Sequence, residues 1–172
     1  MESNKKSLLL GCGNRISRDL DINGSWGELT RLDISKACHP DIIWDLNKLP
    51  LPFEDSEFDE IHVYSVLEHI SIQGDYKHFF EEFNEYWRIL KPGAKFYAIC
   101  PRWDKIWASG DPGHTRIISQ ATLTFLSQNE YKKQIGLTSM TDYREIYKAN
   151  FEVLRVENLG DYDWGFILKA IK

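Results

Sequence analysis

Two glycines near the start of the chain form its clearest chemical motif. Gly11 and Gly13 follow the apolar run Ser7–Leu10 and precede polar residues. This pattern is typical of a buried strand and the tight turn that follows it in an α/β protein. Glycine has no Cβ, so the backbone here can turn sharply and lie against a ligand. At the carboxyl end of a parallel strand, such a turn would form one wall of a binding crevice.

Two acids could supply further walls of the same crevice. Asp33 ends a weak apolar segment and stands 20 positions after Gly13. Nucleotide-binding βαβ units place at this spacing the carboxylate that holds the ribose hydroxyls. Asp45 similarly follows the short apolar segment 42–44. We therefore predict Asp33 as a ribose ligand and Asp45 as a second binding acid, with ordinary strand-end carboxylates as the alternative.

Histidine is the side chain best suited to remove a proton near neutral pH, since its unperturbed pKa is about 6.5. His114 lies in the long segment 102–118, which has no helical or strand periodicity, and long loops in compact domains are usually functional. We predict His114 as the first candidate for a catalytic base and His69 as the second; either could instead be structural. The segment would face the substrate through Trp103, Trp107 and Arg116, or the two tryptophans could simply anchor it.

The elements that must position these residues follow from hydrophobic periodicity and turn signals. An aromatic stripe predicts a helix over 75–90, capped by Asp75, and weaker patterns predict helices over 119–127 and near 143–149. Residues 14–20 could form a short helix or a loop. Seven strands are expected, the last two forming an antiparallel hairpin: 7–10, 29–34, 42–44, 58–65, 94–101, 151–158 and 164–171. The fold class is α/β, a three-layer sandwich around a mostly parallel sheet.

Composition sets the broad class of the protein. A chain of 172 residues fits one domain, 1–172, in which residues 1–6 are expected to be flexible. The net charge of −5 argues against a general nucleic-acid binder. Three cysteines without a paired motif predict reduced thiols, no metal site and a cytoplasmic protein. No apolar run is long enough for a membrane span, and the oligomeric state stays open.

An ordered set of short motifs resembles the class I S-adenosylmethionine-dependent methyltransferases, of the short stand-alone kind. The resemblance covers roughly Leu8–Pro101 and is specific because the motifs occur in order. They are Leu10-Gly11-Cys12-Gly13-Asn14, Asp33, Asp45-Leu46, Leu51-Pro52-Phe53 with Ser56-Glu57-Phe58-Asp59, Leu67-Glu68-His69-Ile70 and Leu90-Lys91-Pro92-Gly93. The resemblance implies a Rossmann-like sheet, S-adenosylmethionine as cofactor and S-adenosylhomocysteine as product.

The resemblance also implies a role for each matching position. Gly11 and Gly13, with Cys12, Asn14 and Arg15 in the same turn, would pass under the methionine part of the cofactor. Asp33 and Ile34 would lie at the ribose, and Asp45 and Leu46 would face the adenine amine. Three residues at the end of the fourth strand would lie beside the sulfonium: Tyr64, Ser65 and Val66.

Two departures from the family pattern leave alternatives open. Leu9 stands where many members have an acid, and Arg15 stands where a glycine is common. Arg15 could instead meet the cofactor carboxylate. A nicotinamide-binding protein would need glycine or alanine at Ile16. The expected function is methyl transfer to a small molecule or sugar, and the alternative is a catalytically silent module that binds the cofactor or a partner.

Overall fold

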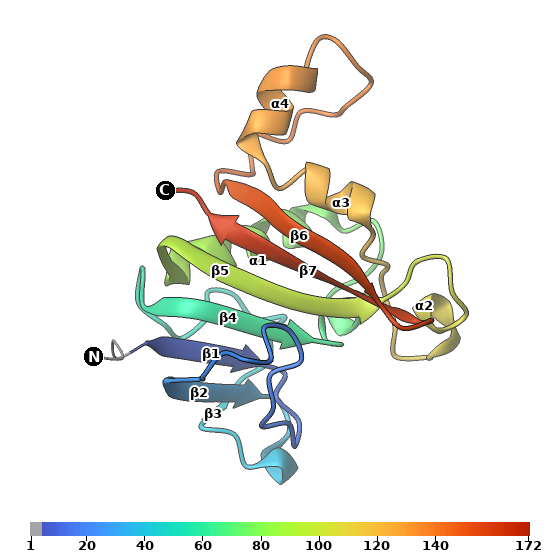
Figure 1. Cartoon of the computed structure of the whole chain (residues 1–172). Helices are drawn as coiled ribbons and strands as arrows, with labels where there is room; N and C mark the ends of the chain where they lie inside the picture. Colours follow the sequence, from blue (N-terminus) through green and yellow to red (C-terminus); the bar gives the residue numbers. More distant parts are fainter. Residues whose placement is uncertain (1–4) are drawn as a thin grey trace.

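Seven strands form one sheet in the order β3-β2-β1-β4-β5-β7-β6 (Figure 1). The computed structural model describes residues 5–172. All neighbouring pairs from β3 to β5 are parallel, and β7 is antiparallel to both β5 and β6. The predicted fold class is therefore confirmed. The strands are β1 (Lys6–Leu10), β2 (Glu28–Asp33), β3 (Ile42–Ile43), β4 (Phe58–Tyr64), β5 (Leu90–Pro101), β6 (Phe151–Leu159) and β7 (Asp163–Ala170).

Strand register brings the predicted ligand-binding segments to one edge of the sheet. Leu10 is paired with Leu32 of β2 on one side and with Val63 of β4 on the other. Asp33 is in turn paired with Ile43 of β3. Since these strands are parallel, their carboxyl ends point the same way, and the loops that follow them meet at that edge.

One face of the sheet is covered by helix α1 (Tyr76–Ile89). Asp75 caps this helix by accepting a hydrogen bond from the backbone N–H of His78 at 3.2 Å, as predicted. The aromatic stripe of the helix is buried against alternate residues of the strands, which form the larger core. The helix ends at Ile89, one residue before the predicted end, because Leu90 already has extended backbone and begins β5.

The opposite face has no helix among residues 14–27, so its outer layer is an irregular segment. This segment crosses in front of the sheet in Figure 1, while α1 lies behind it. Leu20 and Trp26 pack on a smaller core made by the other set of alternating strand residues. Arg18 fastens the segment to the sheet, since its Nη1 donates to Oε2 of Glu60 at 2.9 Å and to the carbonyl of Ser25 at 3.0 Å.

The C-terminal half differs most from the sequence prediction. The segment predicted as one helix over 119–127 contains α3 (Gln120–Thr124), and a second helix, α4 (Gln128–Gln134), follows it. The chain bends between them because the carbonyl of Leu126 accepts a hydrogen bond from the N–H of Phe151 rather than from a helical neighbour. The loop 102–118 contains one short helix, α2 (Trp107–Gly110).

The helix predicted near 143–149 is wrong: the structure has only a turn over 144–146. The Oδ1 atom of Asn84 on α1 accepts hydrogen bonds from the N–H groups of Lys148 and Ala149, at 3.0 and 2.9 Å. Its amide donates to the carbonyl of Ile146. These tertiary contacts satisfy backbone groups that a helix would otherwise pair.

The start of the chain is described from residue 5 onward. The flexibility predicted for residues 1–6 therefore lies largely outside the described residues, and Lys6 belongs to β1.

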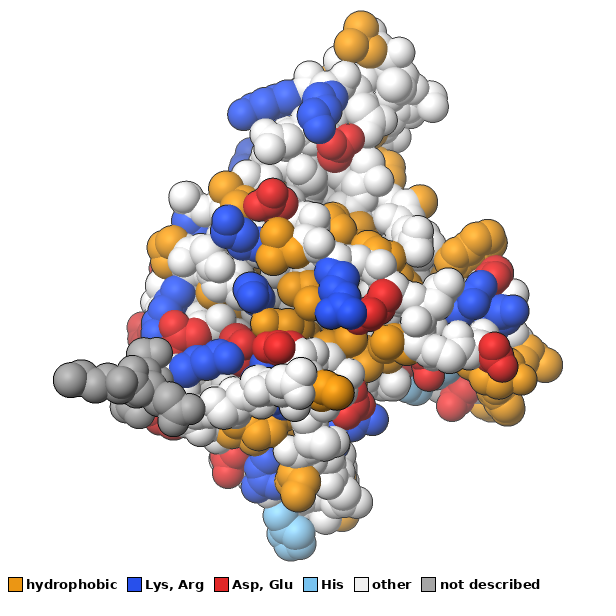
Figure 2. All heavy atoms as spheres, in the orientation of Figure 1, with side chains coloured by type: hydrophobic (Ala, Val, Ile, Leu, Met, Phe, Trp, Pro, Cys, Tyr) orange, Lys and Arg blue, Asp and Glu red, His pale blue; other side chains and the backbone are white. Residues whose placement is uncertain are grey.

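The face of the sheet opposite α1 mixes charged and apolar side chains (Figure 2). Among residues 5–172, no helix combines the length and the apolar character needed to cross a bilayer.

Candidate active site at the carboxyl edge of the sheet

The glycine turn and the acid after β2 are in direct contact. Gly11 and Gly13 both have left-handed backbone, with φ of 59° and 50°, which favours glycine. The carboxylate of Asp33 accepts a hydrogen bond from the N–H of Gly13 at 2.8 Å through Oδ2. Its Oδ1 accepts from the N–H of Ser35, also at 2.8 Å. The predicted ribose acid is therefore held rigidly beside the turn.

The two glycines differ in what lies above them. A Cβ on Gly11 would overlap a methyl group of Val66, whereas a Cβ on Gly13 would meet no described atom within 4 Å. Val66 thus packs directly on the first glycine, and the space over the second is open. Asn14, the next residue, is exposed. Ser65, between β4 and Val66, has a φ of 56° and donates its N–H to the carbonyl of Ile99.

The second predicted binding acid, Asp45, shapes its own loop. Its Oδ1 accepts hydrogen bonds from the backbone N–H of Asn47 at 2.9 Å and from the Asn47 side chain at 3.1 Å. The backbone hydrogen bond is the main cause of the lowered pKa of Asp45. Leu46 packs against the larger core. Ile34, beside Asp33, leaves 67% of its surface exposed and presents an apolar side chain at this edge.

Three other predicted cofactor residues direct their side chains to the smaller core or to neighbours. The thiol of Cys12 is buried there. The hydroxyl of Tyr64 lies 2.6 Å from Nδ1 of His62 inside the same core, and burial raises the pKa of Tyr64 to about 12. Arg15 pairs with Asp19 at 2.5 Å and lies over the Tyr64 ring. Cys12 and Tyr64 therefore offer only their backbone to the crevice.

The loop 102–118 docks beside the segment that follows β4. The N–H of Thr115 donates to the carbonyl of Glu68 at 2.9 Å, and the N–H of Gln73 donates to the carbonyl of Thr115. This pairing brings His114 next to His69, with ring centroids 4.7 Å apart. The two predicted catalytic histidines, separated by 45 positions in sequence, are thus neighbours.

A cavity of about 490 Å³ opens beside these histidines. Trp103, His114 and Arg116 line it, so three of the residues predicted to contact substrate or move protons share one space. Trp107 is half exposed, and its carbonyl lies 2.7 Å from Nδ1 of His114. This carbonyl accepts a hydrogen bond from the ring, which leaves Nε2 of His114 as the basic nitrogen.

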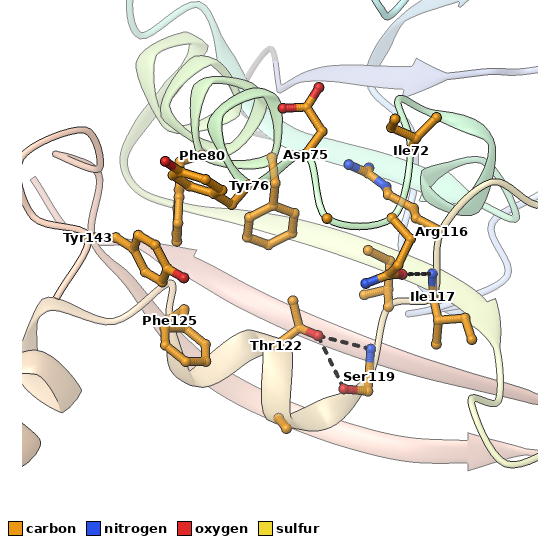
Figure 3. Close-up of a pocket in the computed structure, with 15 residues that line it drawn as sticks. Ile72, Asp75, Tyr76, Phe80, Arg116, Ile117, Ser119, Thr122, Phe125 and Tyr143 are labelled. Carbon is orange, nitrogen blue, oxygen red and sulfur yellow. Dashed lines mark hydrogen bonds between the residues drawn. The ribbon is translucent and has the colours of Figure 1, made fainter. Parts of the chain in front are cut away.

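A second cavity, of about 290 Å³, adjoins the first through shared residues that include Arg116 and Thr122. Aromatic side chains of Tyr76, Phe80, Phe125 and Tyr143 line its far end (Figure 3). The two cavities together place an aromatic wall next to polar groups.

Arg116 is held in its place by a buried ion pair. Its guanidinium lies 2.7 Å from the carboxylate of Glu82 on α1, and both side chains are nearly inaccessible. Its Nε also donates to the carbonyl of Leu67 at 2.6 Å. Arg116 was predicted only as a substrate residue; these contacts anchor the loop, and Arg116 also lines both cavities.

Sequence reasoning missed two residues that matter here, Glu68 and Glu82. Glu68 is 2% exposed and faces the two histidines, and burial raises its pKa. Glu82 sits on the buried face of α1, where the aromatic stripe predicts only apolar contacts. A charged residue on an apolar helix face was the available signal, since such residues are rarely buried without a partner.

The sheet order, the antiparallel last strand and the glycine turn facing an acid define a class I methyltransferase fold. Residues 8–98 match the family model described as a methyltransferase domain, which is more than half of the chain. The chain therefore belongs to the methyltransferase domain family, and the resemblance to class I S-adenosylmethionine-dependent methyltransferases is confirmed. None of the curated proteins that were searched matches the chain.

Solved structures support the same fold. A complex between the Haloferax volcanii Trm112 methyltransferase activator and a putative methyltransferase matches with a TM-score of 0.63 and 14% identity, over 98% of this chain and 84% of that one. An S-adenosylmethionine-dependent methyltransferase from Methanosarcina mazei matches at 0.60 and 18%, over 99% and 94%. The [4+2]-cyclase SpnF matches at 0.59 and 16%, over 98% and 74%. At these identities the likeness shows the fold alone.

Proposed function

We propose that the chain binds S-adenosylmethionine at the carboxyl edge of β1, β2 and β4 and transfers its methyl group. The observation that carries the proposal is the fixed position of the Asp33 carboxylate against Gly13. The ribose hydroxyls would donate to the remaining lone pairs of Asp33, and the open space over Gly13 would receive the methionine part. Ile34 would cover one face of the adenine, and Asp45 would lie near its amine.

Methyl transfer from a sulfonium is an in-line displacement in which the acceptor atom forms a bond to the methyl carbon as the carbon–sulfur bond breaks. The leaving group is the neutral thioether S-adenosylhomocysteine. The protein therefore contributes mainly alignment and exclusion of water. An oxygen or nitrogen acceptor also loses a proton, and Nε2 of His114 is placed to accept it.

The cavity beside His114 is the proposed acceptor site. Its volume of about 490 Å³ fits a small molecule or one to two sugar rings, within the usual range for ligand pockets. Trp103, 60% exposed, would supply a flat apolar surface. We therefore propose a small-molecule or sugar acceptor, with Trp103 and Trp107 closing over it.

Calorimetric titration with S-adenosylmethionine, S-adenosylhomocysteine and NAD tests the cofactor part. We expect micromolar binding of the first two ligands and none of NAD; binding of NAD alone would overturn the proposal. Transfer of a labelled methyl group to a panel of hydroxylated metabolites and sugars then tests the acceptor part.

A catalytically silent module is the second candidate, and one observation favours it. Both carboxylate oxygens of Asp33 already accept backbone hydrogen bonds, and Val66 packs on Gly11. These groups therefore already have partners within the protein. Among proteins of this fold, one is described as a complex with an activator and another as a cyclase. No cofactor binding at all, or cofactor binding without transfer to any acceptor, would support this candidate.

A further inference from the structure

Three side chains with metal-binding atoms converge at the carboxyl edge, beside the proposed acceptor cavity. Glu68, His69 and His114 each place one such atom within 4.8 Å of the others. Glu68 and His69 lie in the short helical turn after β4, and His114 comes from the loop after β5. We propose that these three residues bind a divalent transition-metal ion.

Both histidines are held by backbone carbonyls through Nδ1. Nδ1 of His69 lies 2.9 Å from the carbonyl of Gly113, and Nδ1 of His114 lies 2.7 Å from the carbonyl of Trp107. A carbonyl can only accept, so both Nδ1 atoms carry the proton and both Nε2 atoms keep a free lone pair. Outer hydrogen bonds of this kind fix the tautomer and ring orientation of metal-binding histidines.

The burial of Glu68 without a partner independently points to a cation. Its side chain is 2% exposed, and neither carboxylate oxygen has a hydrogen-bond partner among residues 5–172. A buried carboxylate without partners is costly. Its nearest cationic candidate, Nε2 of His114, is 4.0 Å away, too far for a hydrogen bond. A metal ion between the carboxylate and the imidazoles would satisfy all three groups.

Two histidines and one carboxylate form the ligand set of many Fe²⁺ sites, and imidazole also suits Zn²⁺ and Co²⁺. Metal–ligand bonds of about 2.0–2.2 Å require the three atoms to approach one another more closely, by small side-chain rotations. Asp111, whose Oδ2 lies 3.9 Å from Nε2 of His114, is available as a fourth ligand.

The proposed metal site would change the role of His114 in the proposed function, but it does not depend on cofactor binding. His114 also lines the acceptor cavity, so an acceptor hydroxyl could occupy an open coordination position. In that state a metal would lower the pKa of the hydroxyl, and His114 would act as a ligand instead of a base. Loss of metal binding would leave the assignment of Gly13 and Asp33 untouched.

The test is calorimetric titration of tag-free, metal-stripped protein with Zn²⁺, Co²⁺, Mn²⁺ and, without oxygen, Fe²⁺. We expect at least one ion to bind with one-to-one stoichiometry. Glu68→Gln and His114→Asn should each weaken that binding by about 100-fold, the upper end of the effects seen even for outer-shell changes. His39→Asn, at an exposed histidine away from the cluster, is the matched control and should bind as the wild type does.

Melting temperatures separate a metal ligand from a structural residue. Without metal, Glu68→Gln should melt at or above the wild type, because an unpartnered buried carboxylate has been removed. The metal should raise the melting temperature of the wild type and of His39→Asn only. Binding that is absent from the wild type, or equally strong in all four proteins, would overturn the proposal.

Discussion

The carboxylate of Asp33 accepts a hydrogen bond from the backbone N–H of Gly13 at 2.8 Å. The acid after β2 therefore braces the turn after β1 before any ligand arrives. Since the N–H of Ser35 occupies the other oxygen, the carboxylate has a single orientation. The position that would hold the ribose is thus also the position that keeps the glycine turn in shape.

Asp33→Ala should weaken binding of S-adenosylhomocysteine by about 1–3 kcal/mol, the usual scale for hydrogen bonds to a charged group. Asp33→Asn should also lose affinity, because its amide group places a donor against a backbone N–H. Calorimetry measures both. Asp41→Ala is the control, since Asp41 likewise accepts a backbone hydrogen bond, from Arg31 at 2.8 Å, but lies outside the site. Unchanged affinity in Asp33→Ala would show that another acid holds the ribose.

Alanine at the two glycines should have different effects. The methyl group added by Gly13→Ala meets no described atom, so the cost to folding is the strain of left-handed backbone, about 1 kcal/mol. The same methyl group enters the space proposed for the ligand. Gly11→Ala adds a clash with Val66 and should unfold more readily. Denaturant titration gives the stabilities, and cofactor titration gives the affinities. Full cofactor affinity in Gly13→Ala would place the ligand elsewhere.

Arg15→Ala tests whether Arg15 meets the cofactor carboxylate. The guanidinium already pairs with Asp19 and lies over Tyr64, yet it is about one-third exposed and could turn toward a ligand. If it does, the variant should bind S-adenosylhomocysteine about tenfold more weakly while adenosine affinity stays the same. If the variant binds S-adenosylhomocysteine as tightly as the wild type does, Arg15 does not have this role.

Arg18→Met should destabilise the protein by about 3–5 kcal/mol, because it removes from the buried carboxylate of Glu60 the one cation that is itself buried. Asp55→Ala is the control, since it breaks an ion pair with Arg88 in which Asp55 is 79% exposed and which should contribute under about 1 kcal/mol. Denaturant unfolding at neutral pH measures both changes. Similar values for the two variants would contradict the importance of this buried pair.

Acid should destabilise the protein through the same cluster. Burial would raise the pKa of Glu60, but hydrogen bonds with His62, Arg18 and Lys5 lower it well below 4.5. Its contribution is present above pH 4.5 and is lost as the pH falls toward the folded-state value. Burial also lowers the pKa of His62. As the pH drops below 6.5, His62 therefore binds a proton in the unfolded chain before it does so in the folded protein, and the free energy of unfolding falls. Melting temperatures should decline below pH 6.5, and Glu60→Gln should flatten the slope below pH 4.5.

His114→Ala should lower the rate of methyl transfer to a hydroxyl acceptor by about 10²–10⁴-fold, the range for loss of a general base. Affinity for S-adenosylhomocysteine should not change, because His114 lies on the acceptor side. His78→Ala, on α1, is the control and should keep full activity. Turnover that survives the change at His114 would assign the proton transfer to another group.

The amino-acid sequence by itself determined the strands, helix α1 and the edge at which the site forms. Apolar runs, the aromatic stripe and the glycine turn are local patterns, and parallel strands necessarily bring their carboxyl ends together. Asp33 could be predicted as the ribose ligand for this reason.

Only the tertiary structure decided the outer layer over residues 14–27, the meeting of His69 with His114 and the burial of Glu68. Each depends on contacts between residues far apart in the chain: Arg18 with Glu60, and Thr115 with the carbonyl of Glu68. A single sequence carries no local signal for such contacts, because packing and hydrogen bonding across the fold select them. The glycine turn was therefore readable from the sequence, whereas the Glu68–His69–His114 cluster was not.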